Sequence, residues 1–180
     1  MLGKSDIAPA WYTGRAMTES RTFSLRPSVP GDDEFLYEMF VASRERELAP
    51  LPADMRDTLA RQQYGIYRRG MSAAYSDARN LIVLGPARPA VPERVPIGAL
   101  SLAERPDTLW LIDLVLHPDH RNRGWGTAIL TSLMETCRRE RRILKGSVAP
   151  YNPARRLYAR LGLKEFGGER GYIALEWRPG

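Results

Sequence analysis

Apolar side chains recur at helical spacing in four segments of the chain, and we predict a helix for each. Residues 32–40 begin with two aspartates that can cap a helix and then place four apolar residues on one helical face. Residues 54–72 predict a longer second helix. We expect its buried stripe to consist of Met55, Leu59, Ile66 and Tyr67. Residues 129–142 and 153–161 repeat the helical pattern and complete the set.

Shorter apolar or alternating runs, bounded by Gly and Pro, predict the strands. They are residues 22–26, 81–84, 96–103, 109–116, 143–148 and 172–177. The third and fourth runs flank a turn sequence at 104–108, so they should pair as an antiparallel hairpin. The resulting order is β-α-α-β-β-β-α-β-α-β. This order predicts an α/β (α+β) fold with one mixed sheet and helices on both faces.

The length of 180 residues suits one domain, which we expect to span 21–180. Residues 1–20 show no clean period, and we interpret them as an N-terminal tail or extension outside the fold. No apolar run is long enough for a membrane-spanning helix, and the N-terminus lacks the apolar stretch of a signal peptide. Cys137 is the only cysteine, so no disulfide within the chain is expected. We therefore predict a cytoplasmic protein that does not bind membranes.

The charge of the chain is +6, from 27 Lys and Arg against 21 Asp and Glu. Residues 91–180 hold 15 basic and 10 acidic side chains, whereas residues 1–90 hold 12 and 11. An anionic ligand is therefore expected in the second half of the chain. The arginines at 138–142 close a predicted helix, and we interpret them as a solvated helix end. Nucleic acid is not an expected partner, because no aromatic–basic interleaving or other nucleic-acid motif accompanies the charge.

The second half contains one segment with the physical makeup of an anion site, at residues 116–126. A predicted strand ends at Leu116, and a loop with Arg121, Arg123, Gly124 and Gly126 leads into a helix. Glycines let the backbone come close to a ligand, and the first N–H groups of a helix have no partner within the helix. An exposed basic turn has a similar composition. The pattern by itself is therefore compatible with both a phosphate-binding loop and a surface turn.

Here the chain resembles the GCN5-related N-acetyltransferase (GNAT) family. Arg121, Gly124 and Gly126 match that family's acyl-CoA motif, Arg/Gln-x-x-Gly-x-Gly/Ala, after a strand that ends in hydrophobic-x-Pro. Asn152, with Tyr158 six residues later, is similar to a second signature of the family. Both motifs occur in the family's order. The resemblance covers nearly the whole chain except residues 1–20, and it implies a single mixed, mostly antiparallel twisted sheet.

The resemblance also implies roles for individual residues. Tyr158 would be the general acid that protonates the leaving thiolate of the cosubstrate, acetyl-CoA. The loop amides would hold the pyrophosphate, the end of the preceding strand would bond the pantetheine, and Asn152 would contact the same arm. The residues implied in cofactor binding are Leu114, Val115, Leu116, Arg121, Asn122, Arg123, Gly124, Trp125, Gly126 and Asn152. The family often has a small residue at the position of Arg155, and the larger arginine side chain would narrow the pantetheine channel.

The general base is less well defined by the sequence. Asp113 stands in the apolar run WLIDLVL, where a carboxylate needs a partner or a function. By strand alternation it shares a face with Leu111 and Val115, unless a bulge intervenes. Glu104 at the hairpin turn is a second candidate, and a water-relayed proton transfer is a third. No cluster of His, Cys, Asp or Glu has the spacing of a metal site, so we expect no metal.

We therefore expect an N-acetyltransferase that moves an acetyl or short acyl group from acetyl-CoA to a small-molecule amine by direct attack in a ternary complex. One alternative is a noncatalytic CoA-binding sensor or interaction module. Another is an acetyltransferase whose acceptor is a macromolecular amine, on a protein or an aminoacyl-tRNA. The sequence leaves the identity of the amine open, and with it the question of a homodimer.

Overall fold

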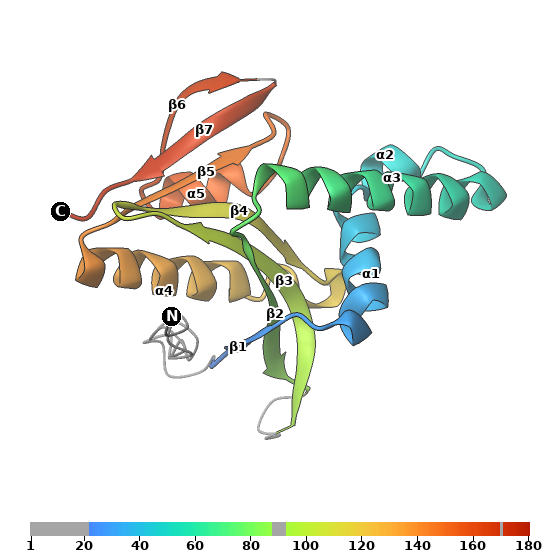
Figure 1. Cartoon of the computed structure of the whole chain (residues 1–180), viewed down its shortest axis with the longest axis horizontal. Helices are drawn as coiled ribbons and strands as arrows, with labels where there is room; N and C mark the ends of the chain where they lie inside the picture. The colour runs from blue at the N-terminus through green and yellow to red at the C-terminus, as the bar shows by residue number, and fades with distance from the viewer. Residues whose placement is uncertain (1–21, 88–92, 170) are drawn as a thin grey trace, which may run out of the picture.

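A computed structural model of the chain describes residues 22–87, 93–169 and 171–180, so the predicted tail at 1–20 lies outside the described residues. One seven-stranded sheet runs through the molecule in the order β1-β2-β3-β4-β5-β7-β6 (Figure 1). Its strands are β1 (Ser24–Pro27), β2 (Arg79–Pro86), β3 (Arg94–Glu104), β4 (Thr108–Leu116), β5 (Ile143–Val148), β6 (Lys164–Glu169) and β7 (Tyr172–Trp177). β4 and β5 pair in parallel, and the other neighbours pair antiparallel. The predicted single mixed sheet is confirmed.

Helices cover both faces of this sheet, as predicted (Figure 1). The helical elements are η2 (Pro30–Asp32), α1 (Asp33–Ser43), α2 (Glu45–Leu48), α3 (Ala53–Ala74), η3 (Pro118–His120), α4 (Trp125–Glu140) and α5 (Arg155–Arg160). The apolar face of α4, with Ile129, Leu130 and Leu133, packs into the main core of the sheet. A second, smaller core forms between α1 and α3 around Tyr37 and Ala60. No helix in the described ranges is long and apolar enough to cross a membrane.

The face that α3 buries differs from the predicted one. Met55 and Ile66, expected in the buried stripe, are 57% and 63% exposed. The helix instead turns Ala60, Tyr64 and Tyr67 inward. The rings of Tyr64 and Tyr67 both pack against the Phe40 ring of α1, and such ring pairs favour this face of α3 for burial.

Strand β6 was not predicted, and its composition explains why. Every residue of Lys164–Glu169 is exposed, so the segment carries no apolar alternation. It pairs with β7 at the edge of the sheet and contains a register shift between Phe166 and Gly168. Polar, irregular edge strands of this kind give little sequence signal because main-chain pairing alone holds them.

A partly buried ion pair fixes β1 to the start of α1. The Arg26 guanidinium donates to both carboxylate oxygens of Asp32, at 2.7 and 2.6 Å, and the Val29 amide donates to the same carboxylate at 2.8 Å. These donors lower the pKa of Asp32 to about 2. The first strand and the first helix are thus connected by a charge-assisted hydrogen-bond pair, which positions α1 against the sheet.

Candidate active site

One extra residue in β4 determines which way Asp113 faces. β3 and β4 pair in register from Gly98–Leu116 to Ser101–Asp113, but the next pair joins Leu102 to Leu111. Ile112 is therefore the additional residue of a β-bulge, which reverses the alternation of the strand beyond it.

The bulge corrects the simple alternation prediction for Asp113. Leu111 belongs to the core under α4, and beyond the bulge Leu114 and Leu116 pack against that same core. Asp113 and Val115 face the opposite side of the sheet, where they line a cavity with α1 and α3. Asp113 therefore does not share a face with Leu111, and its carboxylate is directed out of the apolar core.

This cavity, which we term the α1–α3 cavity, has a volume of about 290 Å³. It is enclosed by α1, α3 and the central strands β2, β3 and β4. Its wall is formed by aromatic and sulfur-containing side chains, and polar groups occupy its floor. Its lining includes Phe40, Arg44, Tyr64, Tyr67, Met71 and Asp113.

A polar row crosses the floor of the α1–α3 cavity. Asn80 of β2, Ser101 of β3 and Asp113 of β4 are direct cross-strand partners. The Ser101 hydroxyl donates to Asn80 Oδ1 at 2.7 Å, and the Tyr67 hydroxyl donates to Asp113 Oδ2 at 3.0 Å. Burial raises the pKa of the Asp113 carboxyl, whereas the Tyr67 hydrogen bond, the Leu114 amide and the charge of Arg44 lower it. Burial is the largest of these effects, so Asp113 binds a proton more readily than an ordinary aspartate.

β4 separates from β5 at the same point. The parallel ladder joins residues 108–111 to residues 143–146, while residues 113–116 pair with β3 on the other side. β5 continues by pairing with β7. In the described sheet, the main-chain groups of 113–116 that face β5 have no strand partner. An extended ligand with amide groups can bond to such an edge as an added strand does.

Tyr158 lies on α5, buried in the main core. Burial raises the pKa of its phenol to about 12, and the negative charge of Asp113 contributes to the increase. Tyr158 is not among the residues that line the α1–α3 cavity. The predicted acid and this candidate base thus come from two separate elements, α5 and β4.

The loop before α4 has the backbone geometry of an anion site. Asn122 and Gly124 have positive φ angles of 57° and 80°, and Gly124 is the N-cap of α4. The first N–H groups of this 16-residue helix lack partners within the helix and lie at its positive dipole end. At Gly126, a Cβ atom would lie 3.0 Å from Leu157 Cδ2, so the glycine lets α4 approach α5 closely. The arrangement suits a phosphate or pyrophosphate group.

The two arginines of this loop have different surroundings. The Arg121 guanidinium donates to the main-chain carbonyls of Leu116 at 3.0 Å and Ala42 at 3.1 Å. Arg121, which the resemblance assigned to cofactor binding, thus connects the end of β4 to the end of α1 through its guanidinium. Arg123 is exposed, and no hydrogen bond joins its side chain to another residue of the described ranges. Its guanidinium is free to approach a ligand.

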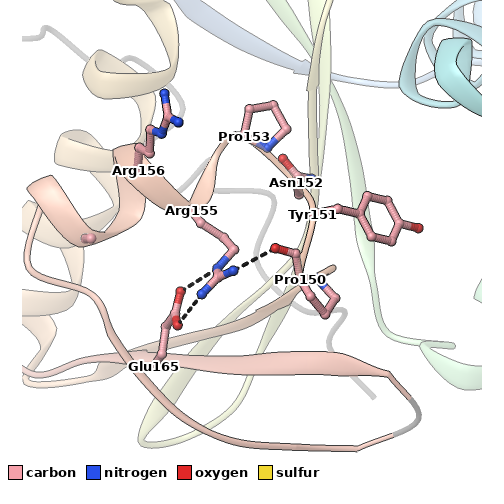
Figure 2. A pocket seen from close by; sticks show the side chains of 8 residues that line it. Pro150, Tyr151, Asn152, Pro153, Arg155, Arg156 and Glu165 are labelled. Atoms are coloured by element: carbon pink, nitrogen blue, oxygen red, sulfur yellow. Dashed lines mark hydrogen bonds and ion pairs between the residues drawn. The ribbon is translucent and has the colours of Figure 1, made fainter.

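Asn152 and Arg155 form the connection between β5 and α5 (Figure 2). Asn152 Oδ1 accepts a hydrogen bond from the Ala154 amide at 2.9 Å, which shapes the turn into the helix. Arg155 donates to both oxygens of Glu165 at 2.8 and 2.9 Å and to the Pro150 carbonyl at 2.6 Å. Figure 2 shows the Arg155 side chain directed toward Glu165 and Pro150. These bonds fix the position of Arg155, the residue that we expected to narrow the pantetheine channel.

The other candidate base is in a different environment. Glu104 is bound by Arg142 at 3.0 Å and by Arg79 at 3.2 Å, at the hairpin end of β3 and β4. Both ion pairs lie at the far end of the hairpin, and Glu104 does not line the α1–α3 cavity. Asp113 is thus the base candidate that the structure favours by its surroundings. No group of three or more His, Cys, Asp or Glu within the described ranges is placed to hold a metal ion.

Sequence reasoning missed Tyr67 as a functional residue. Its helical spacing assigned it to an apolar stripe, and nothing local in the sequence indicates that its hydroxyl reaches Asp113 on a strand 46 positions away. The same holds for the partnership of Asn80, Ser101 and Asp113, which depends on the register of three strands.

Comparison with known proteins completes the description of the site. The family model described as the acetyltransferase (GNAT) family matches residues 52–163 of the chain, which include the bulge, the loop before α4 and Tyr158. No curated protein sequence matches the chain.

Several solved structures share the fold. The PaiA N-acetyltransferase from Thermoplasma acidophilum, solved in complex with coenzyme A, is 16% identical with a TM-score of 0.62, and the match covers 87% of this chain and 98% of that one. A GCN5-related N-acetyltransferase from Rhodopseudomonas palustris is 23% identical with a TM-score of 0.55, over 86% and 94% of the two chains. An acetyltransferase from Thermus thermophilus is 19% identical with a TM-score of 0.58, over 87% and 96%.

Proposed function

Because the chain belongs to the acetyltransferase (GNAT) family, we propose that it transfers an acetyl or short acyl group from acetyl-CoA to an amine by direct attack within a ternary complex. The observation that carries this proposal is the position of Asp113, which lines the α1–α3 cavity just beyond the point where β4 leaves β5. A proton acceptor and a proton donor on either side of a thioester are what aminolysis requires.

The donor side of the proposal rests on two features. The amides at the start of α4, with the exposed Arg123, are suited to the pyrophosphate of CoA. The unpaired edge of residues 114–116 is suited to the amide groups of the pantetheine arm. A match to a coenzyme A complex at 16% identity is consistent with the same donor.

The acceptor side follows from the α1–α3 cavity. An amine enters as an ammonium ion and must lose a proton before it attacks. Asp113 lines the cavity, and burial raises the pKa of its carboxyl, which brings it closer to that of a useful base. Asp113 accepts the proton directly or through water, the amine nitrogen bonds to the carbonyl carbon, and the carbon–sulfur bond breaks.

Tyr158 completes the proton balance. The departing CoA thiolate takes up one proton from the phenol of Tyr158, and the second proton that the nitrogen loses as the amide forms returns to the phenolate, directly or through water. With a pKa of about 12, the phenol is protonated at neutral pH and can donate. The products are an amide and free CoA, and no covalent bond to the protein forms. Cys137, the single cysteine, is buried in the main core.

The Tyr158→Phe variant tests this proposal. Loss of the phenol proton should lower kcat by roughly 10²–10⁴-fold, the usual range for general acid–base catalysis, with binding of acetyl-CoA retained. Thiol release from acetyl-CoA, measured over a panel of amines, provides the rate. Tyr172→Phe, at an exposed position of β7, is the matched control and should keep full activity. An unchanged rate in the Tyr158→Phe variant would contradict the assigned role, and absence of amine-dependent thiol release would indicate a noncatalytic CoA-binding protein.

A further inference from the structure

The α1–α3 cavity has an aromatic wall on the side of the helices. The ring of Phe40 lies 5.3 Å from that of Tyr64 and 5.3 Å from that of Tyr67, in tilted arrangements. Met71 of α3 extends this wall. A surface of this kind stabilises an apolar or aromatic group of a ligand, and it provides few partners for a long polar chain.

Arg44 adds a cation to this wall. Its guanidinium carbon lies 4.0 Å from the centroid of the Phe40 ring and 5.4 Å from that of Tyr67. Stacking on aromatic faces restricts the orientation of a guanidinium without using its N–H donors. The N–H donors of Arg44 are therefore held in one orientation and remain available to a ligand.

The other arginines near the cavity are paired, and Arg44 is not. Arg68 forms an ion pair with Asp33, and Arg61 binds Glu34 and Asp57. In the part of the chain that the structure describes, no carboxylate forms an ion pair with Arg44, and its one side-chain hydrogen bond is to the Ser43 hydroxyl at 3.4 Å. A half-buried cation that lines a cavity and lacks an acidic partner is suited to an anionic ligand group.

The cavity thus holds two groups of opposite charge that are not paired with each other. Asp113 is on the floor and Arg44 is on the wall. They are close enough that the charge of Arg44 affects the Asp113 carboxyl, yet they do not form an ion pair. A simple amine would satisfy only Asp113 and would leave Arg44 without a partner.

We propose that the acceptor is an amino acid type of compound: an amine that carries a carboxylate next to an apolar or aromatic side chain. The inference rests on the proposed transferase function. The amine faces Asp113, the carboxylate binds the fork of Arg44, and the side chain packs on Phe40, Tyr64 and Met71. Acetylation of the amine removes its positive charge and leaves the carboxylate in place.

The test compares matched acceptors in the thiol-release assay. Phenylalanine, leucine and methionine are each measured beside their carboxamide and their decarboxylated amine, all with the intact chain. Wild type should prefer the carboxylate compounds in kcat/KM by roughly 10–100-fold, the range expected for charge-assisted hydrogen bonds to a carboxylate. The carboxamides have less basic amines, so more of each is neutral and ready to attack. A preference for the carboxylate over the carboxamide therefore reports recognition and not amine basicity.

Variants of Arg44 test whether this residue binds the carboxylate of the acceptor. Arg44→Gln should raise KM for the carboxylate compounds and bring the preference close to one. The ratio between compound classes is the readout, because the effect of the lost charge on Asp113 applies to every amine. Arg44→Lys should keep part of the preference, since it retains the charge and loses the bidentate fork. Arg69→Gln is the control, because Arg69 is an exposed arginine of α3 that does not line the cavity.

The outcomes separate this inference from the function on which it rests. Equal rates for amines with and without the carboxylate, or an unchanged preference in the Arg44→Gln variant, would overturn the inference and leave the transferase function intact. If peptide-like carboxamides react best, the acceptor is the terminus of a macromolecule and the inference is wrong. If no amine of any class releases thiol, both the proposed function and the inference are overturned.

Discussion

Asp113 owes its position to a single inserted residue. Without the bulge at Ile112, strand alternation would bury its carboxylate in the core beside Leu111. With the bulge, Asp113 accepts a hydrogen bond from the Tyr67 hydroxyl and lines the α1–α3 cavity. The cost of this position is the removal of a charged group from water, which is visible in the raised pKa of the carboxyl.

Activity and stability should therefore respond to Asp113→Asn in opposite directions. If Asp113 is the base, kcat of the wild type should rise with pH as the carboxyl loses its proton, at a pH above that of an ordinary aspartate. The Asp113→Asn variant should lack this rise, and its kcat should be lower by roughly 10²–10⁴-fold. The measurement is kcat against pH for both proteins. A pH profile that is unchanged in the variant would contradict the role of Asp113.

The stability effect follows from the same pKa. The folded chain holds the Asp113 proton more tightly than the unfolded chain does, so the stability linked to this group is present at low pH and is lost as the pH rises from 3.8 through the folded pKa. At neutral pH, Asp113→Asn should therefore have a higher Tm than wild type, since the asparagine oxygen can still accept from Tyr67. Thermal unfolding at several pH values measures this difference. A lower Tm at neutral pH would indicate that the carboxylate has a structural role instead.

At the scale of elements, we propose that the loop between β4 and α4 combines ligand binding and structural support, with one arginine for each task. Arg121 joins the end of β4 to the end of α1 through two main-chain carbonyls. Arg123 is exposed beside the amides of the α4 N-terminus. Arg121 should thus contribute to the stability of the fold, whereas Arg123 should contribute to ligand binding.

Substitution of these arginines separates the two tasks. Arg121→Ala leaves partly buried carbonyls without a donor and should lower the free energy of unfolding by about 2 kcal/mol. Arg123→Ala should change stability by less than about 0.5 kcal/mol, as an exposed substitution does, and should raise KM for acetyl-CoA several-fold. Urea unfolding and the KM for acetyl-CoA measure both effects. Similar stability losses in the two variants would contradict the division of roles.

Elements with strong local signals were predictable from the sequence, and those set by distant pairing were not. The apolar run of β4 and the amphipathic pattern of α4 were recognisable in the sequence. The glycine-containing loop between them indicated a candidate anion site. Strand β6 and the bulge at Ile112 depend on register with a neighbour and left no local pattern. The same limit applies to Tyr67, because its partner lies on another element.

At the scale of the whole molecule, the positive charge has more than one use. The cluster at 138–142, which we interpreted as a solvated helix end, is partly engaged. Arg142 is 22% exposed in its side chain and binds Glu104 and Glu140, and Arg138 stacks over Trp177 at 5.4 Å. The unpaired cations near the candidate site, Arg44 and Arg123, face the proposed acceptor and donor. The proposed function therefore depends on these two arginines and not on the net charge of the chain.

The central claim is direct transfer from acetyl-CoA to an amine, and a single-turnover experiment tests it most directly. The protein is mixed with acetyl-CoA with and without an apolar amino acid, and released thiol, amide product and the mass of the protein are measured over time. We predict one amide for each thiol released, thiol release only when the amine is present, and an unchanged protein mass throughout. Thiol release without amine that leaves an acetylated protein, which then passes its acetyl group to the amine, would contradict the claim.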